Sequence, residues 1–400
     1  MKNVLIIQSS LRGFFFNFGK YLTHHVFINV TKPGPDPRTQ TPPSYFQEIN
    51  RQKNSLLSKF RRVFGILNIR PFFYFSGSMV FTYGCLLLTN KPYCVCMENG
   101  LALFNYDPHI ALHPAAKLIL YTCLIDPHLK KLIFLSEAAK ASFFSSVKLP
   151  TLVKNIISNK SEVCYPITGR QSLPLKRKYN TSVVKFLFVG YFYMKGGMEL
   201  VNTVIKLNKK FSSKYEVYIV TQNKLMRDSD IQWVKTIPNI HLIEADLNSD
   251  QMNNLYSQCD AFIYPTYRDS FGLVLLEAIS WGLPVICTNQ FATKEMVIDN
   301  NTGFILNKHP MQDYDLKTYQ IYGKYYQPNI FYHDLFLFQK LRKFKDVENF
   351  LYISMEKLIN SPQMLLKMKN NTTAFYQNKF NYHLSSAKIE MIFDQTDLSH

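Results

Sequence analysis

The 400-residue sequence lacks a C-x-x-C pair, a G-x-G-x-x-G turn and any internal repeat. Its seven cysteines are odd in number and stand mostly in apolar runs. This pattern is typical of thiols buried in the core of a protein from a reducing compartment, and it argues against a disulfide framework or a thiolate zinc site. Without the glycine-rich turn, a nicotinamide or flavin cofactor has no support. We therefore expect no resident cofactor.

Acidic residues are scarce in the first part of the chain. Residues 1–180 contain 23 Lys and Arg against 7 Asp and Glu, whereas the remainder contains 23 against 21. An apolar content of 47% with only 18% charged residues excludes a disordered chain, and the length suffices for two domains with cores of their own. The N-terminus runs directly into a predicted strand, so we expect no signal peptide and a cytoplasmic protein.

Residues 259–287 predict a strand, a loop, a helix and a second strand, which is the unit of a parallel sheet. The apolar run Ala261–Tyr264 ends in a proline turn, the polar loop Thr266–Ser270 follows, and Gly282 and Pro284 end the helix. In α/β proteins such loops, at the carboxyl ends of strands, bind ligands. We expect Asp269 or Ser270 to cap this helix.

The start of that helix is a candidate anion site. The first backbone N–H groups of a helix have no acceptor within it, and they attract phosphate. The residues that would supply or shape this site are Ser270, Phe271, Gly272 and Leu273. Glu277 lies further along the same helix and could accept hydrogen bonds from ligand hydroxyls.

The wider pattern resembles a known family. The D-x7-E spacing from Asp269 to Glu277 is similar to the E-x7-E signature of retaining GT-B glycosyltransferases (glycosyltransferase group 1, family 4-like). Their flanking motifs recur here as Pro265–Ala278, Gly282–Ile286 and Phe291–Val297. An ordered run of more than 30 residues is far more specific than the spacing alone.

The resemblance implies an α/β GT-B protein made of two Rossmann-like, doubly wound domains that face each other across a cleft. Residues 1–175 would be the acceptor-binding domain and residues 181–375 the domain that binds the nucleotide-sugar donor. Residues 376–400 would form a helix that crosses back to the first domain.

Further donor-site residues follow from the same resemblance. After a predicted strand, Gly190 and the segment Lys195-Gly196 match the family's glycine, short loop and K-G-G pattern, and the resemblance implies that Lys195 holds the donor diphosphate. A cation there stabilises charge that develops on the leaving group. The chain departs from the pattern at Tyr191, where many relatives have arginine.

The resemblance also implies a catalytic role for Asp269, near the transferred sugar, and a donor-binding role for Glu277, which would hold the donor ribose. A second catalytic residue, Glu98, is expected in the first domain. Relatives often carry a histidine at the end of a strand in the first domain; here Glu98 or Asn99 occupies the best-matching place. No metal is implied, because Lys195 and the helix N-terminus can hold the diphosphate.

The function implied is transfer of a hexose from a nucleotide diphosphate sugar, used as co-substrate, to a hydroxyl of a glycan or lipid-linked acceptor at the inner face of a membrane. Two alternatives stay open. The chain could be a catalytically inactive relative that binds glycans or acts as a scaffold, or it could glycosylate DNA bases. The second lacks a base-flipping signature, so a nucleic-acid partner is not expected.

Two segments bear on the membrane. Residues 47–67 predict a basic amphipathic helix with Leu56, Phe60, Val63 and Leu67 on its apolar face. Such a helix suits an anionic membrane surface, and docking on its own domain is the alternative. Residues 71–90 are uncharged, but their glycines favour a buried strand followed by a buried helix over a membrane span.

Overall fold

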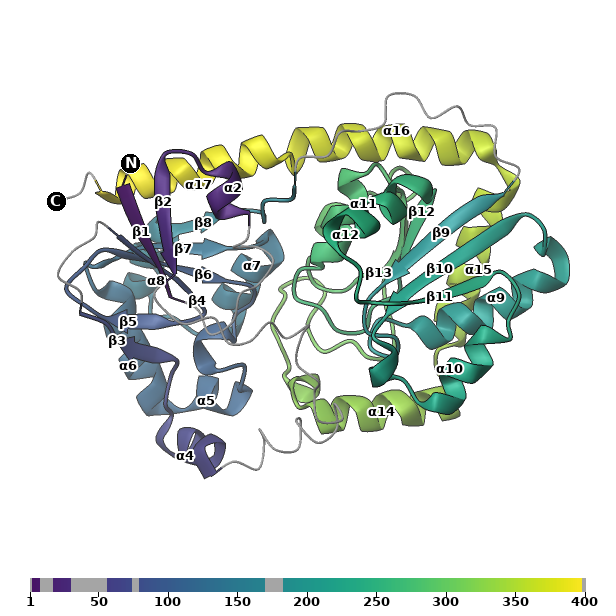
Figure 1. The fold of residues 1–400 in the computed structure, drawn as a ribbon. Coiled ribbons are helices and arrows are strands. Elements are labelled where there is room, and N and C mark those ends of the chain that lie inside the picture. The colour runs from purple at the N-terminus through teal and green to yellow at the C-terminus, as the bar shows by residue number, and fades with distance from the viewer. Residues whose placement is uncertain (1, 8–16, 30–55, 74–78, 170–182, 398–400) are drawn as a thin grey trace. The chain divides into compact units, whose positions relative to one another are not determined.

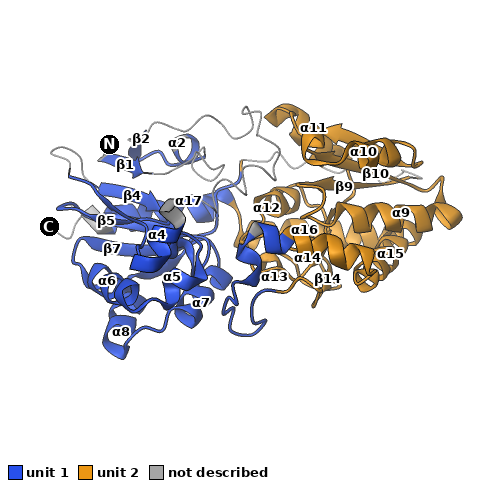
Figure 2. Ribbon diagram, turned by 90° about the horizontal axis from the view of Figure 1, so that it is seen from below, with its two compact units in different colours: residues 1–168, 313–331, 382–400 blue, residues 169–312, 332–381 orange. Residues whose placement is uncertain are grey.

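The computed structural model describes residues 2–7, 17–29, 56–73, 79–169 and 183–397. The chain forms two compact units, each discontinuous in sequence (Figure 2). Unit 1 comprises residues 1–168, 313–331 and 382–400, and unit 2 comprises residues 169–312 and 332–381. The sequence predicts a return to the first domain only for residues 376–400, and the place of residues 313–331 in unit 1 was not anticipated.

A parallel sheet with the strand order β2-β1-β4-β6-β7-β8 forms the centre of unit 1. Its strands are β1 (Lys2–Ile7), β2 (His25–Asn29), β4 (Met79–Tyr83), β6 (Tyr93–Met97), β7 (Leu129–Phe134) and β8 (Ser161–Val163). Every residue of β6 is buried. Strands covered on both faces read as continuous apolar runs, and β6 has the sequence of such a strand.

The helices of unit 1 connect and cover these strands (Figure 1). They are α2 (Phe18–Tyr21), α4 (Leu56–Phe64), η1 (Ala102–Phe104), α5 (Pro108–Leu112), α6 (Pro114–Ile125), α7 (Glu137–Ser146), α8 (Thr151–Lys160), η3 (Lys324–Tyr326) and α17 (Tyr382–Asp397). Ser136 caps α7, because its hydroxyl accepts the Ala139 N–H at 2.9 Å.

Helix α17 belongs to unit 1 although it ends the chain. Its Phe393 lies in an aromatic cluster with Phe18, Phe27 and Phe81, at ring-centroid distances of 6.4, 6.1 and 5.7 Å. Glu390 of the same helix accepts the Thr23 N–H at 2.8 Å. Aromatic rings at such distances bury large apolar areas, so this cluster fixes the end of the chain on the first sheet.

The described residues of the segment 71–90, which are 71–73 and 79–90, form strands and no helix, although the sequence predicts a strand followed by a helix. Strand β3 (Ile69–Pro71) pairs in parallel with β5 (Leu86–Leu88), and β4 lies between them in sequence. The periodicity of a short apolar run does not distinguish a strand from a helix. This ambiguity explains why the helix predicted here was wrong. Among the residues that the structure describes, no helix is long and apolar enough to cross a membrane.

A second parallel sheet, ordered β11-β10-β9-β12-β13-β14, forms the centre of unit 2. Its strands are β9 (Val184–Val189), β10 (Tyr215–Thr221), β11 (Ile240–Glu244), β12 (Ala261–Tyr264), β13 (Val285–Thr288) and β14 (Gly303–Leu306). The chain moves from β9 outward to β11, then returns to β12 and continues the other way. The order therefore reverses between β9 and β12, which is where doubly wound sheets bind ligands.

Helices cover both faces of this sheet (Figure 1). They are α9 (Gly197–Phe211), η2 (Asn223–Leu225), α10 (Asp228–Lys235), α11 (Ser249–Gln258), α12 (Leu273–Ser280), α13 (Thr293–Met296), residues 332–340 of α14 (Pro328–Lys340), α15 (Lys345–Asn360) and α16 (Pro362–Lys379). Right-handed crossovers place α9 and α10 on one face and α11 and α12 on the other.

Candidate functional site

The reversal of strand order in unit 2 is held by Asp260, directly before β12. Its backbone N–H donates to the Lys185 carbonyl at 2.7 Å, and its carboxylate accepts the Lys185 N–H at 2.9 Å. The Lys369 ammonium lies 3.3 Å from the same buried carboxylate. Strands β9 and β12 therefore run side by side, and the loops that follow them lie at the same edge of the sheet.

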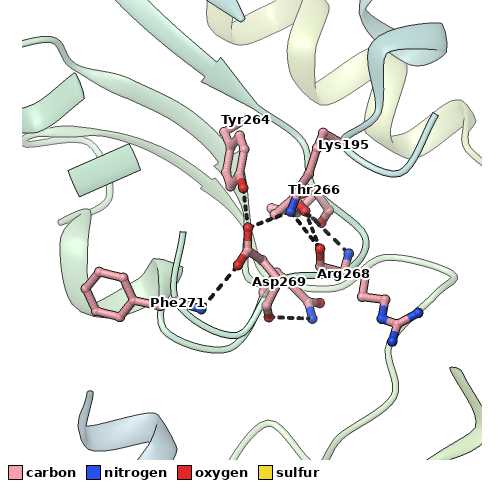
Figure 3. Close-up of polar contacts among 8 residues, drawn as sticks. Lys195, Tyr264, Thr266, Arg268, Asp269 and Phe271 are labelled. Atoms are coloured by element: carbon pink, nitrogen blue, oxygen red, sulfur yellow. Dashed lines mark hydrogen bonds and ion pairs between the residues drawn. The ribbon is translucent and has the colours of Figure 1, made fainter. Parts of the chain in front are cut away.

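Those two loops bring Lys195 and Asp269 together although they are far apart in sequence. The Lys195 Nζ lies 2.5 Å from Asp269 Oδ2 and donates to the Arg268 carbonyl at 2.8 Å. The Tyr264 hydroxyl donates to the same carboxylate oxygen, so Asp269 lies between Tyr264 and Lys195 (Figure 3). The Lys195 and Asp269 side chains are only 11% and 19% exposed, so the pair is weakly screened by solvent.

Asp269 is ionised in this setting. Burial alone raises the pKa of its carboxyl, but the Lys195 ammonium and the hydrogen bonds from Lys195, Tyr264 and the Phe271 N–H together hold that pKa below its ordinary value. The site therefore presents a fixed carboxylate beside a fixed ammonium. This arrangement can accept a hydrogen bond from a ligand hydroxyl and attract an anion at neighbouring positions.

The expected helix cap is wrong. Gly272, and not Asp269 or Ser270, is the N-cap residue of α12, and no side chain caps the helix. Asp269 Oδ1 instead accepts the Phe271 N–H at 3.2 Å, within the loop. The backbone of Gly272 has a φ of 88°, a left-handed value that favours glycine. Leu273 begins the helix, so its N–H group has no acceptor inside the helix and is available to an anion.

The other predicted donor-site glycines pack against the same two loops. A Cβ on Gly196 would lie 2.5 Å from the Pro265 carbonyl, and the φ of this residue is 76°. Only glycine at position 196 lets the loop after β9 approach the loop after β12 so closely. The Gly190 N–H donates to the Val220 carbonyl at 3.0 Å, which ends β9 next to the stem of Lys195. Tyr191, at the place of the family's arginine, is 42% exposed.

Glu277 lies on α12 with its side chain open to solvent. The Tyr256 hydroxyl donates to Glu277 Oε2 at 3.0 Å. Partial loss of hydration raises the pKa of this carboxyl, and the hydrogen bond from Tyr256 opposes the rise. Because the side chain keeps its access to solvent, the shift contributes little to folding stability. Tyr256 fixes one carboxylate oxygen and leaves the group able to accept a hydrogen bond from a ligand.

If Glu277 holds the donor ribose, as the resemblance implies, Glu277→Gln should raise the donor KM about tenfold or more, because a hydrogen bond from a hydroxyl to a charged acceptor would become a weaker neutral one. Steady-state kinetics with a nucleotide-sugar donor would measure the change. Glu356→Gln is the matched control. Glu356 lies on α15 and pairs with Lys210 of α9 at 2.9 Å, and it is not among the predicted site residues. Equal donor KM values for the two variants would remove Glu277 from the site.

Glu98 belongs to unit 1, at the carboxyl end of β6. The Tyr83 hydroxyl donates to its Oε2 at 2.6 Å. The neighbouring Asn99 is fully buried, and its side-chain oxygen accepts the Leu101 N–H at 2.9 Å. Asn99 therefore shapes the turn after β6, whereas Glu98, which is half-buried, is the better candidate to contact an acceptor.

Two buried residues that sequence reasoning missed support the Asp269 loop. His309 shares a hydrogen bond of 3.1 Å between its Nε2 and Gln290 Oε1, and Gln290 Nε2 donates to the Asp269 carbonyl at 3.4 Å. Burial lowers the pKa of His309 to about 3, so the ring is neutral. His309 Nδ1 accepts the Met311 N–H, which leaves Nε2 as the donor. Gln290 stands directly before the motif Phe291–Val297. This position beside a family motif was the signal in the sequence that could have pointed to Gln290.

The region that contains this site matches a known family. Residues 173–319 match the family model described as Glycosyl transferases group 1. That region includes Lys195, Asp269 and Glu277. It covers the loops at the strand reversal and leaves unit 1 largely outside the match.

Similar proteins support the same assignment. The capsular polysaccharide biosynthesis glycosyltransferase CapM of Staphylococcus aureus is 31% identical over 232 residues, which are 55% of this chain and 58% of CapM. An uncharacterised glycosyltransferase of Methanocaldococcus jannaschii is 23% identical over 229 residues, 56% of this chain and 60% of that protein. The chain thus spans about half the length of the curated relatives it matches.

Solved structures share the fold across the whole chain. A glycosyltransferase from Rickettsia africae has a TM-score of 0.57 at 14% identity and covers 100% of this chain and 99% of its own. The Anabaena protein HepE, solved in complex with UDP, has a TM-score of 0.59 at 11% identity and covers 99% and 100%. The predicted fold class, α/β GT-B with two Rossmann-like units, is confirmed.

Proposed function

We propose that the chain is a retaining glycosyltransferase that moves a hexose from a nucleotide diphosphate sugar to a hydroxyl group of a glycan or lipid-linked acceptor. The observation that carries this proposal is the Lys195–Asp269 pair at the strand reversal of unit 2, inside the region that matches group 1 glycosyltransferases. The printed names of the relatives, which include capsule glycosyltransferases, favour a glycan product.

The positively charged groups of the site would bind the diphosphate, and its carboxylates would bind hydroxyl groups of the donor. Lys195 and the first free N–H groups of α12 would bind the donor diphosphate and stabilise the negative charge that grows as the bond to the sugar breaks. Asp269 would accept a hydrogen bond from the sugar, and Glu277 would accept one from the ribose. Lys195 and the N-terminus of α12 supply positive charge to the diphosphate from the protein itself, so we propose that no metal ion is required.

The acceptor would attack from the same face as the departing diphosphate. As the new glycosidic bond forms and the bond to the diphosphate breaks, the acceptor hydroxyl would lose its proton to a diphosphate oxygen. The sugar would then keep its anomeric configuration. Glu98, at the end of β6, is our proposed contact for the acceptor in unit 1.

The direct test is a donor panel of UDP-, GDP- and ADP-sugars, read by thermal shift and by hydrolysis with and without EDTA. UDP-sugars are the first choice, because HepE was solved with UDP. We expect binding and hydrolysis that EDTA does not change, and NMR of the product should show the donor's anomeric configuration. Absence of binding by every donor would overturn the proposal, and binding without any turnover would favour an inactive glycan-binding relative.

We also propose that unit 1 attaches to the inner face of an anionic membrane through α4. Phe60, Val63 and Phe64 on this helix are 52%, 68% and 55% exposed, so the described part of unit 1 leaves these three apolar side chains uncovered; residues 47–55 of the predicted helix lie outside the described residues. Lys59 and Arg61 add positive charge, whereas Arg62 forms an ion pair with Asp107. An exposed apolar face with flanking cations is typical of helices that lie at a lipid surface.

Vesicle flotation tests the attachment. Binding to anionic vesicles should weaken as salt increases and should fall strongly in the double variant Lys59→Glu, Arg61→Glu, since each cation near an anionic leaflet contributes about 1 kcal/mol. Arg62 is left unchanged because its pair with Asp107 holds the helix. The control is Lys209→Glu, Lys214→Glu in unit 2. Equal flotation of both double variants, or retention on duplex DNA alone, would contradict the proposal.

A further inference from the structure

Unit 2 contains a second concave site, away from the strand reversal. A cavity of about 900 Å³ opens among α9, α14 and α15, with Arg227 before α10 at its edge. Its apolar lining includes Met198, Ile205, Phe336 and Phe344, and the amides of Asn202, Gln339 and Asn349 add hydrogen-bonding groups. A volume of this size accommodates a small-molecule ligand. None of the residues predicted for the donor site lines it.

The rim of this cavity is cationic. Five of its lining residues carry positive charge, and they are Lys206, Arg227, Lys340, Arg342 and Lys345. Lys206 pairs with Glu348 at 2.6 Å, and Arg227 pairs with Asp230 at 3.0 Å. Within the described parts of the chain, no ion pair is found for Lys340, Arg342 or Lys345, and all three are exposed. Three free cations at one opening favour an anionic ligand, and phosphate in particular.

The other wall of the cavity holds a buried acid. Glu199, on the first turn of α9, is 1% exposed, and its Oε1 accepts the Gln339 amide at 3.1 Å. The Tyr267 hydroxyl interacts with the same carboxyl group. Burial raises the pKa of this carboxyl to about 7. A polar group in the wall of an otherwise apolar cavity suits a ligand that carries hydroxyl groups.

The cavity contacts the loop that carries Asp269. Phe344 lines the cavity, and its ring lies 4.6 Å from the ring of Tyr267, two residues before Asp269. The buried Tyr267 hydroxyl interacts with the Glu199 carboxyl group in the cavity wall. The Tyr267 N–H donates to the Met194 carbonyl at 3.0 Å, next to Lys195. A ligand that restrains Phe344 and Glu199 would therefore restrain the loops that hold the Lys195–Asp269 pair.

We propose that this cavity binds a phosphate-bearing, hydroxyl-rich small molecule of the sugar-phosphate class. The phosphate would lie among Lys340, Arg342 and Lys345, and a hydroxyl would reach Glu199. The occupied site would hold the loop around Tyr267 in the arrangement that binds donor, which makes the ligand an activator. Only this last step rests on the proposed glycosyltransferase function.

Isothermal titration calorimetry with glucose 6-phosphate, in the absence of nucleotide, tests the site. The triple variant Lys340→Ala, Arg342→Ala, Lys345→Ala should weaken binding at least about tenfold, because it removes the charge-assisted hydrogen bonds. The matched control is Lys209→Ala, Lys214→Ala, Lys235→Ala, which removes three exposed lysines of unit 2 outside the cavity. The control should bind within about twofold of the parent chain.

Two further variants separate this site from others. Lys195→Ala should leave binding of glucose 6-phosphate unchanged. If Lys195→Ala abolished binding while the triple variant bound normally, the sugar phosphate would occupy the donor site. That result would overturn the proposal. Glu199→Gln keeps the contact with Gln339 and should weaken glucose 6-phosphate about fivefold without changing the affinity for inorganic phosphate. Equal effects on both probes would remove Glu199 from the ligand.

The coupling to the donor loop has its own readout. Saturating glucose 6-phosphate should lower the donor KM of the parent chain about fivefold and leave that of the triple variant unchanged. An unchanged KM in the parent chain would overturn the activating role. Calorimetry requires no enzymatic turnover, so failure of the proposed function would leave the binding result intact and would be recognised as a separate failure.

Discussion

Lys195→Ala is expected to lower kcat/KM for the nucleotide-sugar donor about 100- to 1,000-fold, the cost of removing one preorganised group that stabilises developing charge. The Lys195 ammonium is fixed by Asp269 at 2.5 Å and by the Arg268 carbonyl at 2.8 Å, so it would meet the diphosphate without further reorganisation. Steady-state and single-turnover kinetics would measure the loss. The single-turnover rate should fall more than donor affinity, because the charge grows in the transition state.

The control for this variant is Lys185→Ala, on β9, the strand that precedes the loop with Lys195. Lys185 lies 3.8 Å from Glu216, and its side chain is 33% exposed, so its removal should change neither kinetics nor folding appreciably. A second variant, Lys195→Met, keeps the length of the stem that packs beside Gly190 and removes only the charge. If Lys195→Met retains full activity while folded, the donor diphosphate is held elsewhere.

The sequence predicts the sheet of unit 2 well because its strands are buried on both faces. The predicted bounds of β12 agree with the structure, since it is a short apolar run that ends in a proline turn. The helix cap was wrong for a local reason. Asp269 has the right chemistry for a cap, but its carboxylate is engaged by Lys195 and Tyr264, and Gly272 takes the cap position through its left-handed backbone.

The pairing of Lys195 with Asp269 could not be read from their spacing. They are brought together by the order of the strands, which places β12 next to β9 and makes the two loops neighbours. A resemblance to a family identifies both residues, but only the topology explains their contact. Gln290 and His309 act on the loop through buried hydrogen bonds, which leave no periodic pattern in a single sequence.

The cavity among α9, α14 and α15 lay beyond sequence reasoning for a similar reason. Part of its lining comes from residues 311–345, a segment for which the sequence suggests no function, and part comes from α9, far earlier in the chain. Glu199 reads as an ordinary acid in the first turn of a helix, where it complements the helix dipole. Its burial and its polar contacts appear only when Gln339 and Tyr267 pack around it.

Asp269→Ala should destabilise unit 2 by roughly 3–5 kcal/mol, because it leaves the Lys195 ammonium buried without its counter-charge. Asp269→Asn should cost less, since the amide oxygen can still accept the hydrogen bonds from Phe271 and Tyr264. Urea unfolding at neutral pH would measure both values. Asp246→Asn, at an exposed position, is the control and should leave the free energy of unfolding unchanged.

The loss in the Asp269 variants should depend on pH in a defined direction. The folded-state pKa of Asp269 lies below the ordinary value of 3.8, so its ionised form stabilises the fold fully above that value. As the pH falls from 3.8 through the lowered pKa, the parent chain loses this stabilisation, whereas Asp269→Asn has none to lose. The stability difference between the two chains should therefore be constant from about pH 5 to 7 and shrink at about pH 3. A difference that does not change with pH would show that Asp269 is held by packing and hydrogen bonds, and that its charge does not stabilise the pair with Lys195.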